Sequence, residues 1–395
     1  MLIPTTGPSG VLRGRDLICF SHDWSGDPLS KTHLMRLLAR DNRILWVNSI
    51  GYRTPTASRA DVGRVFKKLG AFFTPIREAE PNLFVLNPLA IPFYGPIARA
   101  VNRRWLRSQV LGAMRKLGMR RPINWVFNPA AAVIAGTLGE ESLIYYCVDE
   151  YAAFSGVPAK ALADLESDLL RKADLVVVSA DRLLSSKAPR NPHTVLVRHG
   201  VDFDLFRRAL DPATQIPQAI AHLPRPILGY FGLIAPDWVD LDLLIRLARG
   251  YPGGSLVMLG KVAMDVSELA SLPNVHLLGR QPYEHLPAYC RGFDVGLIPF
   301  PISEVTLNAN PLKAREYLAA GLPVISTAIP EVAVLPHCRM AGDVDAFLRE
   351  VGAALADPGP KRSRSESMRG ESWQARLDEV RGHMAALSLG GMVSS

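Results

Sequence analysis

The segment NPLKAREYLAAGLPVIST, Asn310 to Thr327, joins a helical pattern to a buried-strand pattern through a Gly-Leu-Pro break. Asparagine caps helices well and proline fits the first helical position, so the segment predicts a helix that starts at Pro311. Free backbone N–H groups and the positive end of the helix dipole favour an anion at such a start. Lys313 and Glu316 lie one turn apart just inside this helix.

Two interpretations of the Lys313 and Glu316 pair stay open. A lysine is a point charge suited to phosphate, and a glutamate can accept hydrogen bonds from ribose hydroxyls, so the two together describe a pocket for a nucleoside diphosphate. Alternatively, they form a solvated surface pair worth about 0.2–0.5 kcal/mol. The surrounding sequence has to decide between these interpretations.

Outward from this segment, the chain alternates short apolar runs with amphipathic stretches, which predicts an α/β fold with parallel sheets. Several of the runs are apolar on both faces, as buried parallel strands are. The strand-like runs of the first half are DLICFSH, RILWVNS, NLFVLNP, INWVFNP, LIYYCVD, ADLVVVSA and TVLVRHG. Those of the second half are PILGYFG, GSLVMLG, NVHLLG, FDVGLIPF and PVIST.

The chain has 395 residues, which suits two domains of roughly 150 to 200 residues each. The sequence predicts a first domain over 1–206 and a Pro-punctuated linker over 207–226, where the periodicity breaks. A second domain over 227–360 follows. We expect 361–395 to form an exposed loop and a last amphipathic helix that packs on the first domain.

The composition is that of a globular protein, with 48% hydrophobic and 21% charged residues. The four cysteines show no metal-binding or disulfide spacing, which favours reduced thiols in a cytosol. The N-terminal residues are too polar for a secretory signal and the apolar runs are only strand-length, so we expect a cytoplasmic protein without a membrane span.

The formal net charge of +8 is concentrated in two nearly acid-free segments, 53–77 and 96–121, which also carry aromatic and aliphatic residues. A basic helix with an apolar face is typical of an element that lies on an anionic membrane surface. A solvated helix packed on its own domain explains the same pattern, and both interpretations stay open. Nucleic acid is not expected as a partner, because no nucleic-acid-binding module surrounds these segments.

The ordered set of motifs resembles the GT-B glycosyltransferases, particularly the family 4-like enzymes of the glycosyl transferases group 1 type that use nucleotide sugars in polysaccharide biosynthesis. The motifs run from about Asp16 to Val332 and include ADLVVVSADRLL, VLVRHGVDFDLF, GYFGLI and VHLLGRQPYEHLPAYCRGFDVGLIPF. The resemblance implies two doubly wound Rossmann-like domains facing a central cleft. It also implies transfer of a sugar from a nucleoside diphosphate donor, which we expect to be UDP- or GDP-linked. We expect no cofactor, and no metal because the His22 and Asp23 pair lacks further metal ligands at a suitable spacing.

By the same resemblance, Glu316 is the second glutamate of the family's Glu-x7-Glu signature and holds the donor ribose. Asn308 stands where the first glutamate is expected. The family's arginine and lysine clamp after the glycine of GYFG is missing, since Gly232 is followed by Leu-Ile-Ala-Pro-Asp-Trp. We therefore expect Lys313, the helix start at Asn310 and Arg280 to neutralise the diphosphate beside Gly232.

The acceptor is expected at the first domain. The loop after the first strand carries His22, Asp23 and Gly26 into a helix start at Lys31, as the family's first loop does. Another strand ends in YYCVDEY, which supplies Asp149 and Glu150.

An inverting transfer needs a carboxylate that takes the acceptor hydroxyl proton. Asp149 is the preferred base and Asp23 the second choice. Each can equally be a turn or helix-capping aspartate, and a transfer that retains configuration needs no such base.

The predicted function is a glycosyltransferase of cell-surface or exopolysaccharide assembly, acting on a lipid-linked or oligosaccharide acceptor. We expect it to be peripheral on the inner face of the plasma membrane. Two alternatives stay open: a GT-B sugar-nucleotide 2-epimerase and a non-catalytic subunit that binds a nucleotide sugar.

Overall fold

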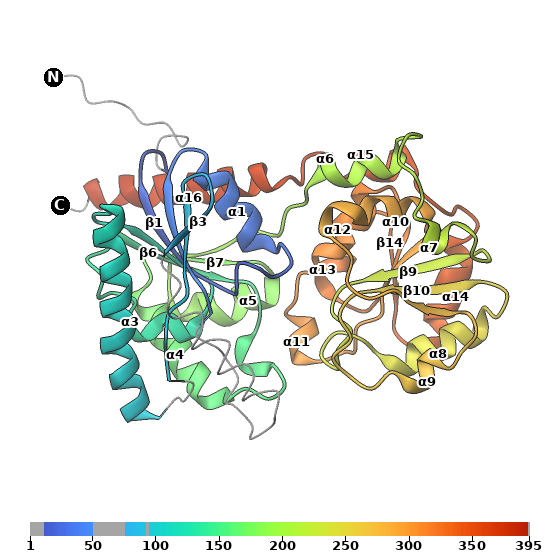
Figure 1. Cartoon of the computed structure of the whole chain (residues 1–395), viewed down its shortest axis with the longest axis horizontal. Coiled ribbons are helices and arrows are strands. Elements are labelled where there is room, and N and C mark those ends of the chain that lie inside the picture. Colours follow the sequence, from blue (N-terminus) through green and yellow to red (C-terminus); the bar gives the residue numbers. More distant parts are fainter. Residues whose placement is uncertain (1–11, 50–75, 92–94, 394–395) are drawn as a thin grey trace. The chain divides into compact units, whose positions relative to one another are not determined.

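The computed structural model describes residues 12–49, 76–91 and 95–393. The chain divides into two compact units, of which the first comprises Met1–Arg198 and Arg376–Ser395 and the second His199–Ala375 (Figure 1). Each unit is built on its own parallel sheet with helices packed against it. The predicted α/β class with two doubly wound domains is therefore confirmed.

The first sheet has eight strands in the order β3-β4-β2-β1-β5-β6-β7-β8. All neighbouring pairs are parallel except β3 and β4, which are antiparallel. The strands are β1 (Asp16–Phe20), β2 (Arg43–Val47), β3 (Arg77–Glu80), β4 (Leu83–Leu86), β5 (Ile123–Val126), β6 (Ser142–Cys147), β7 (Leu175–Val178) and β8 (Thr194–Leu196).

The helices of the first unit pack on this sheet, and its hydrophobic core includes Leu106 and Val110 of α3 and Leu165 and Leu169 of α4. They are α1 (Ser30–Ala39), α3 (Pro96–Leu117), α4 (Ala159–Lys172), α5 (Asp181–Lys187), the 3₁₀ turns η2 (Pro129–Val133), η3 (Tyr151–Ala153) and η4 (Ala188–Arg190), and α16 (Trp373–Val393) from Arg376 onward. None of the helices in the described ranges combines the length and the apolar character needed to cross a bilayer.

The second sheet has six strands, all parallel, in the order β11-β10-β9-β12-β13-β14. The strands are β9 (Ile227–Phe231), β10 (Ser255–Leu259), β11 (Val275–Leu277), β12 (Val295–Ile298), β13 (Val324–Thr327) and β14 (Cys338–Ala341). The helical elements are α6 (Phe203–Phe206), η5 (Arg207–Leu210), α7 (Gln218–Ala221), α8 (Leu241–Gly250), α9 (Ser267–Ala270), η6 (Tyr283–His285), α10 (Leu286–Gly292), α11 (Glu304–Leu307), α12 (Leu312–Ala319), α13 (Pro330–Ala333), α14 (Val344–Ala354) and α15 (Arg362–Glu366).

Each sheet has one point where the strand order reverses, between β1 and β5 in the first unit and between β9 and β12 in the second. In doubly wound sheets, ligands bind outside the carboxyl ends of the strands at this switch point. In the second unit, α8 and α12 leave the switch point on opposite sides of the sheet (Figure 1). The two switch points are therefore where functional side chains are sought.

The second unit begins earlier than the sequence pattern suggested. Val201, Phe203 and Phe206 belong to its hydrophobic core, so the segment before 206 packs with the second sheet. The predicted linker also contributes to this core, because Ile220 of α7 is fully buried. The prolines of residues 207–226 break the periodicity, but this segment packs on the second unit and is not a flexible linker.

The predicted exposed loop after residue 361 is wrong for its first part. Residues 362–366 form α15, and the buried Arg364 donates from Nε to the carbonyl of Gly321 at 2.7 Å. Ser365 donates its hydroxyl to the carbonyl of Ala319 at 2.6 Å. These side chains donate hydrogen bonds to backbone carbonyls at and just after the end of α12. The polar sequence of 362–366 gave no sign of this role.

Candidate functional site

Helix α12 begins at Leu312, with Pro311 in the capping position. The prediction that Asn310 caps this helix is wrong. Its Oδ1 accepts a hydrogen bond from Nη1 of the buried Arg315 at 2.6 Å, and its carbonyl lies 2.8 Å from Nδ1 of His199. Asn310 is therefore buried and held inside the second unit.

Glu316 is not part of a solvated helix face. Its side chain is 6% exposed, and the hydroxyl of Tyr283 donates to its Oε1 at 2.9 Å. Burial raises the pKa of Glu316 to about 7, against the opposing effects of the Tyr283 hydrogen bond and the charge of Lys313. The surface-pair interpretation therefore does not fit the structure.

Lys313 lies at the carboxyl ends of the two strands that flank the switch point. Its Nζ is 4.5 Å from the ring centre of Phe300, which follows β12, and 5.3 Å from that of Tyr230 on β9. Burial lowers the pKa of this ammonium to about 8, and the charge of Glu316 opposes the shift. A half-buried, charged lysine at a switch point can bind an anion.

Gly232 brings the backbone of the β9 loop against this lysine. Its φ of +138° is a conformation that side chains rarely adopt, and a Cβ there would lie 3.2 Å from Cε of Lys313. Gly260, after β10, lies behind it, because a Cβ on Gly260 would collide with the carbonyl of Gly232. Gly232, predicted from one motif, is thus brought together with Lys313 and Glu316, which were predicted from another.

Two other predicted donor residues are placed differently. The buried Asn308 donates from Nδ2 to the carbonyl of Glu304 at 2.7 Å and to its Oε2 at 3.3 Å. Its amide group is therefore bound to α11, the preceding helical turn. Arg280 is exposed in the segment between β11 and Tyr283.

Tyr283, Phe300 and Tyr230 are the site residues that the sequence motifs did not single out. They come from three separate loops or strands and meet only in the folded unit. Their one sequence signal is that Phe300 and Tyr230 are aromatic residues at or near the carboxyl ends of apolar runs.

In the first unit, the structure brings Lys31 of α1 close enough to Asp149, after β6, for the two charges to interact. Lys31 is buried, and burial lowers its pKa. Burial raises the pKa of the half-buried Asp149 to about 6, against the opposing charge of Lys31. A carboxyl group with a pKa near neutrality can act as a general base.

The loop after β1 places its predicted residues in different surroundings. Burial lowers the pKa of His22 to about 3, and its Nδ1 lies 3.1 Å from the hydroxyl of Ser21. Asp23 is exposed, and its carbonyl accepts a hydrogen bond from the N–H of Gly26 at 3.0 Å. This turn agrees with the turn interpretation of Asp23.

Glu150 belongs to a buried ion-pair cluster. Its Oε2 accepts from Nζ of Lys187 at 2.8 Å, and the same ammonium donates to Glu166 at 2.7 Å. The hydroxyl of Tyr145 also donates to Glu166, at 2.5 Å. Glu150 is therefore engaged within the first unit, beside Asp149.

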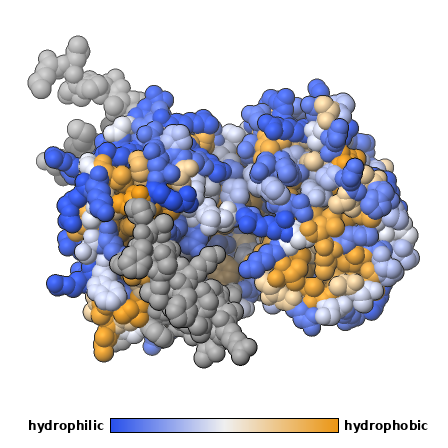
Figure 2. Space-filling view, in the orientation of Figure 1, coloured by the Kyte–Doolittle hydropathy of each residue, from blue (hydrophilic) through white to orange (hydrophobic). Residues whose placement is uncertain are grey.

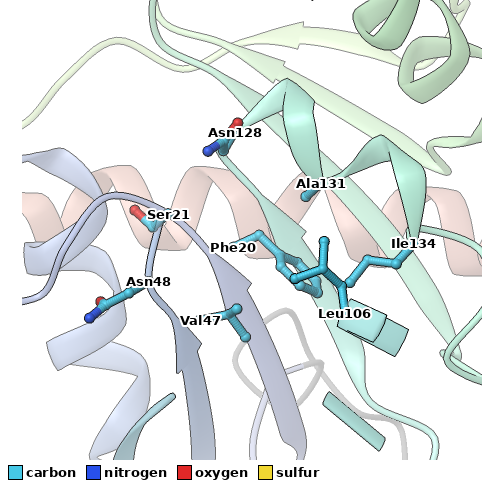
Figure 3. Close-up of a pocket in the computed structure, with 8 residues that line it drawn as sticks. All are labelled: Phe20, Ser21, Val47, Asn48, Leu106, Asn128, Ala131 and Ile134. Atoms are coloured by element: carbon cyan, nitrogen blue, oxygen red, sulfur yellow. The ribbon is translucent and has the colours of Figure 1, made fainter. Parts of the chain in front are cut away.

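A small pocket lies at the switch point of the first sheet (Figure 3). Ser21, Asn48 and Asn128 supply its polar groups at the carboxyl ends of β1, β2 and β5. The remaining lining is apolar and consists of Phe20, Val47, Leu106, Ala131 and Ile134. No charged side chain of the described residues lines it.

The described part of the chain contains no cluster of three or more histidine, cysteine, aspartate or glutamate side chains that could hold a metal ion. The four cysteines are free, and three of them are buried.

Comparison with known proteins agrees with this architecture. Residues 225–357 match the family model "Glycosyl transferases group 1". The chain is 29% identical over 223 residues to a Bacillus subtilis (strain 168) protein, TuaH, assigned as a teichuronic acid biosynthesis glycosyltransferase. That match covers 52% of this chain and 55% of TuaH, so it spans about half the length of the relative.

Solved structures resemble the chain over nearly its whole length. Sucrose-phosphate synthase from Thermosynechococcus elongatus superposes with a TM-score of 0.69 at 17% identity, covering 96% of this chain and 100% of the other. HepE from Anabaena in complex with UDP-glucose superposes with a TM-score of 0.61 at 12% identity, covering 95% and 99%. Over residues 225–357 the second unit is therefore similar to the glycosyl transferases group 1 family, and the chain has the GT-B fold.

Proposed function

We propose that the protein transfers a sugar from a nucleoside diphosphate sugar to a lipid-linked or oligosaccharide acceptor in the assembly of a cell-surface polysaccharide. The observation that carries this proposal is the group formed by Lys313, Glu316 and Gly232 at the switch point of the second sheet. Lys313 supplies a cation for the diphosphate, and the Glu316 carboxylate accepts hydrogen bonds from the ribose. Gly232 has no side chain, so the loop after β9 places no Cβ against the Lys313 ammonium.

Two comparisons support the donor class, and a third supports the role in polysaccharide synthesis. The group 1 family match covers the unit that contains this group of residues. HepE has been solved with UDP-glucose and with UDP. TuaH supports a role in cell-surface polysaccharide synthesis. A UDP-linked sugar is therefore the first donor to test, and a GDP-linked sugar the second.

For the chemical step, we propose that Asp149 is the general base of an inverting transfer. The acceptor oxygen forms a bond to the anomeric carbon, the bond from that carbon to the phosphate oxygen breaks, and the nucleoside diphosphate leaves. The acceptor hydroxyl proton passes to the Asp149 carboxylate. Its raised pKa suits this role, because a carboxylate with a pKa near the working pH is a stronger base than an ordinary one and is still largely ionised.

The donor-site proposal is tested by a thermal-shift panel of UDP, GDP, ADP and their sugars. A ligand at a hundred times its dissociation constant stabilises the protein by about 2.7 kcal/mol, which such a scan detects. No shift with any member would refute the donor site. Binding without transfer or donor hydrolysis would favour a non-catalytic binding subunit, and a 2-epimerised nucleotide sugar as product would favour the epimerase.

We also propose that helix α3 places the protein on an anionic membrane surface, at the inner face of the plasma membrane. Its 22 residues contain no acid, and Figure 2 shows a largely hydrophilic surface along its course, with a hydrophobic cluster at its lower end. Ile97 is 81% exposed and Trp105 50% exposed. Arg103 and Arg104 lie beside Trp105, are exposed, and have no ion-pair partner among the described residues.

Sedimentation with lipid vesicles tests the membrane proposal. Each cation near an anionic surface contributes about 1 kcal/mol, so changing both Arg103 and Arg104 to glutamate should abolish binding to phosphatidylglycerol vesicles. The matched control changes the exposed Arg349 and Arg362 of the second unit to glutamate and should bind as the wild type does. Equal losses in both variants would show that only net charge matters, and α3 would then be an ordinary solvated helix.

A further inference from the structure

The ammonium of Lys313 rests on an aromatic seat formed by Phe300 and Tyr230, with ring centres 4.5 Å and 5.3 Å from Nζ. A third ring supports this seat, because Trp238 packs against Phe300 with ring centres 5.3 Å apart. Phe300 and Tyr230 are almost fully buried, whereas Trp238 is half-buried. Lysine contacts with the faces of two rings at these distances are attractive cation–π interactions.

The seat also fixes the loop that faces the ammonium. Tyr230 donates its hydroxyl to the carbonyl of Leu233 at 2.9 Å, which closes the turn at Gly232. A Cβ on Gly232 would lie 3.2 Å from this hydroxyl and 3.3 Å from Nζ of Lys313. The ring, the glycine backbone and the ammonium are therefore in mutual contact.

The seat leaves the charge of Lys313 available to a ligand. Among the described residues, Lys313 forms no hydrogen bond and no ion pair within 4.0 Å. A carboxylate in van der Waals contact would neutralise the ammonium and compete with a phosphate, whereas an aromatic face holds it without satisfying its hydrogen-bond donors. The three N–H donors therefore remain free for an incoming anion.

We propose that Phe300 and Tyr230, supported by Trp238, are positioning residues that hold the Lys313 ammonium against Gly232 for the diphosphate of the donor. The inference rests on the proposed donor site. It accounts for the absence of the arginine and lysine that the family resemblance implies after Gly232, where this chain has Leu233 and Ile234. In this proposal, Lys313 held by the two rings binds the diphosphate in place of the expected arginine and lysine.

The test compares a nucleoside diphosphate with its own nucleoside, because only the former reaches Lys313. Dissociation constants are measured by calorimetry for UDP and uridine, and for GDP and guanosine, with the wild type and with Phe300→Leu. We expect Phe300→Leu to weaken diphosphate binding about five- to twentyfold and to change nucleoside binding less than twofold. Phe300→Tyr keeps an aromatic face and should restore the wild-type ratio.

A double-mutant cycle with Lys313→Met separates positioning from general packing. If the ring acts through the ammonium, Phe300→Leu has no further effect on diphosphate binding once Lys313 is replaced. Trp238→Leu, at the half-buried edge of the seat, provides the same test if Phe300→Leu does not fold, and should weaken diphosphate binding in the same direction.

Three results would overturn the inference. Equal weakening of diphosphate and nucleoside binding would assign Phe300 a purely structural role, and unchanged binding of both would remove it from the site. Full additivity with Lys313→Met would show that the ring does not act through the lysine. If the wild type bound none of the diphosphates, the proposed donor site would be refuted. If the wild type bound a diphosphate but Phe300→Leu did not weaken it selectively, only the role of the aromatic seat would be refuted.

Discussion

Replacing Glu316 with glutamine keeps the shape of the side chain and its ability to accept a hydrogen bond from Tyr283, but removes the buried charge. In the folded protein, the pKa of Glu316 is raised from 4.5 to about 7. At about 1.4 kcal/mol per pH unit, the ionised carboxylate therefore destabilises the folded state by about 3 kcal/mol at pH 8. The same charge should strengthen binding to ribose hydroxyls.

The sign of the pH effect follows from proton linkage. Between pH 4.5 and about 7 the folded state binds more protons at Glu316 than the unfolded state does, so its contribution to stability is present below pH 4.5 and is lost as the pH rises through about 7. Glutamine has no proton to lose. The free energy of unfolding of Glu316→Gln, relative to wild type, should therefore rise by about 2–3 kcal/mol between pH 5 and pH 8.

Urea unfolding at pH 5 and pH 8 measures the stability, and calorimetry with the nucleoside diphosphate measures the affinity. A hydrogen bond to a charged group contributes about 1.5–3 kcal/mol and an amide keeps part of it, so we expect binding to weaken about five- to thirtyfold. The variant should thus be more stable at pH 8 and bind less well. Glu284→Gln, a neighbouring exposed carboxylate, should change neither quantity.

The reasoning would be refuted if Glu316→Gln showed the same pH dependence of unfolding as the wild type and bound the nucleotide within twofold of it. That outcome would return Glu316 to the role of a surface charge. A gain in stability without loss of affinity would keep the burial argument but remove Glu316 from the ribose site.

Three further predictions concern the other sites. Nucleoside diphosphate affinity should be greatest between pH 7 and 8, since Glu316 ionises through a pKa of about 7 and Lys313 loses its proton through a pKa of about 8; a flat profile by calorimetry would contradict both roles. Asp149→Asn should lower kcat about 10²- to 10⁴-fold with nucleotide affinity unchanged, whereas Asp23→Asn should lower it less than threefold; similar effects in a transfer assay would argue against Asp149 as the base. Trp105→Ala should weaken sedimentation with anionic vesicles, and wild-type binding would show that this ring does not enter the lipid surface.

The fold could be predicted from sequence because its parallel strands are buried on both faces and therefore appear as apolar runs. The runs around Leu143 and Val176, for example, became β6 and β7. Strand β3 was missed, since its residues Arg77 to Glu80 form a charged, antiparallel edge strand with no apolar face. Strand β14, from Cys338 to Ala341, was missed for a related reason, as it lies at the other edge of a sheet.

The candidate site could be predicted only in part. The order of motifs singled out Glu316 and Lys313, and local spacing placed them on one helix. The sequence did not show which group would hydrogen-bond the side chain of Asn310. We expected it to cap α12, but its Oδ1 accepts a hydrogen bond from Arg315 instead. The aromatic seat depends on side chains separated by about 70 residues along the chain, such as Tyr230 and Phe300, and such contacts arise only from tertiary packing.

The central claim is that the second unit binds a nucleoside diphosphate sugar through Glu316 and Lys313. Calorimetric titration of UDP-, GDP- and ADP-sugars into the wild-type protein and into Glu316→Ala tests it most directly. We predict that at least one of these sugars binds the wild type with one-to-one stoichiometry and that Glu316→Ala binds it at least tenfold more weakly while remaining folded. Absence of binding to all of them, or equal affinity in the two proteins, would contradict the account.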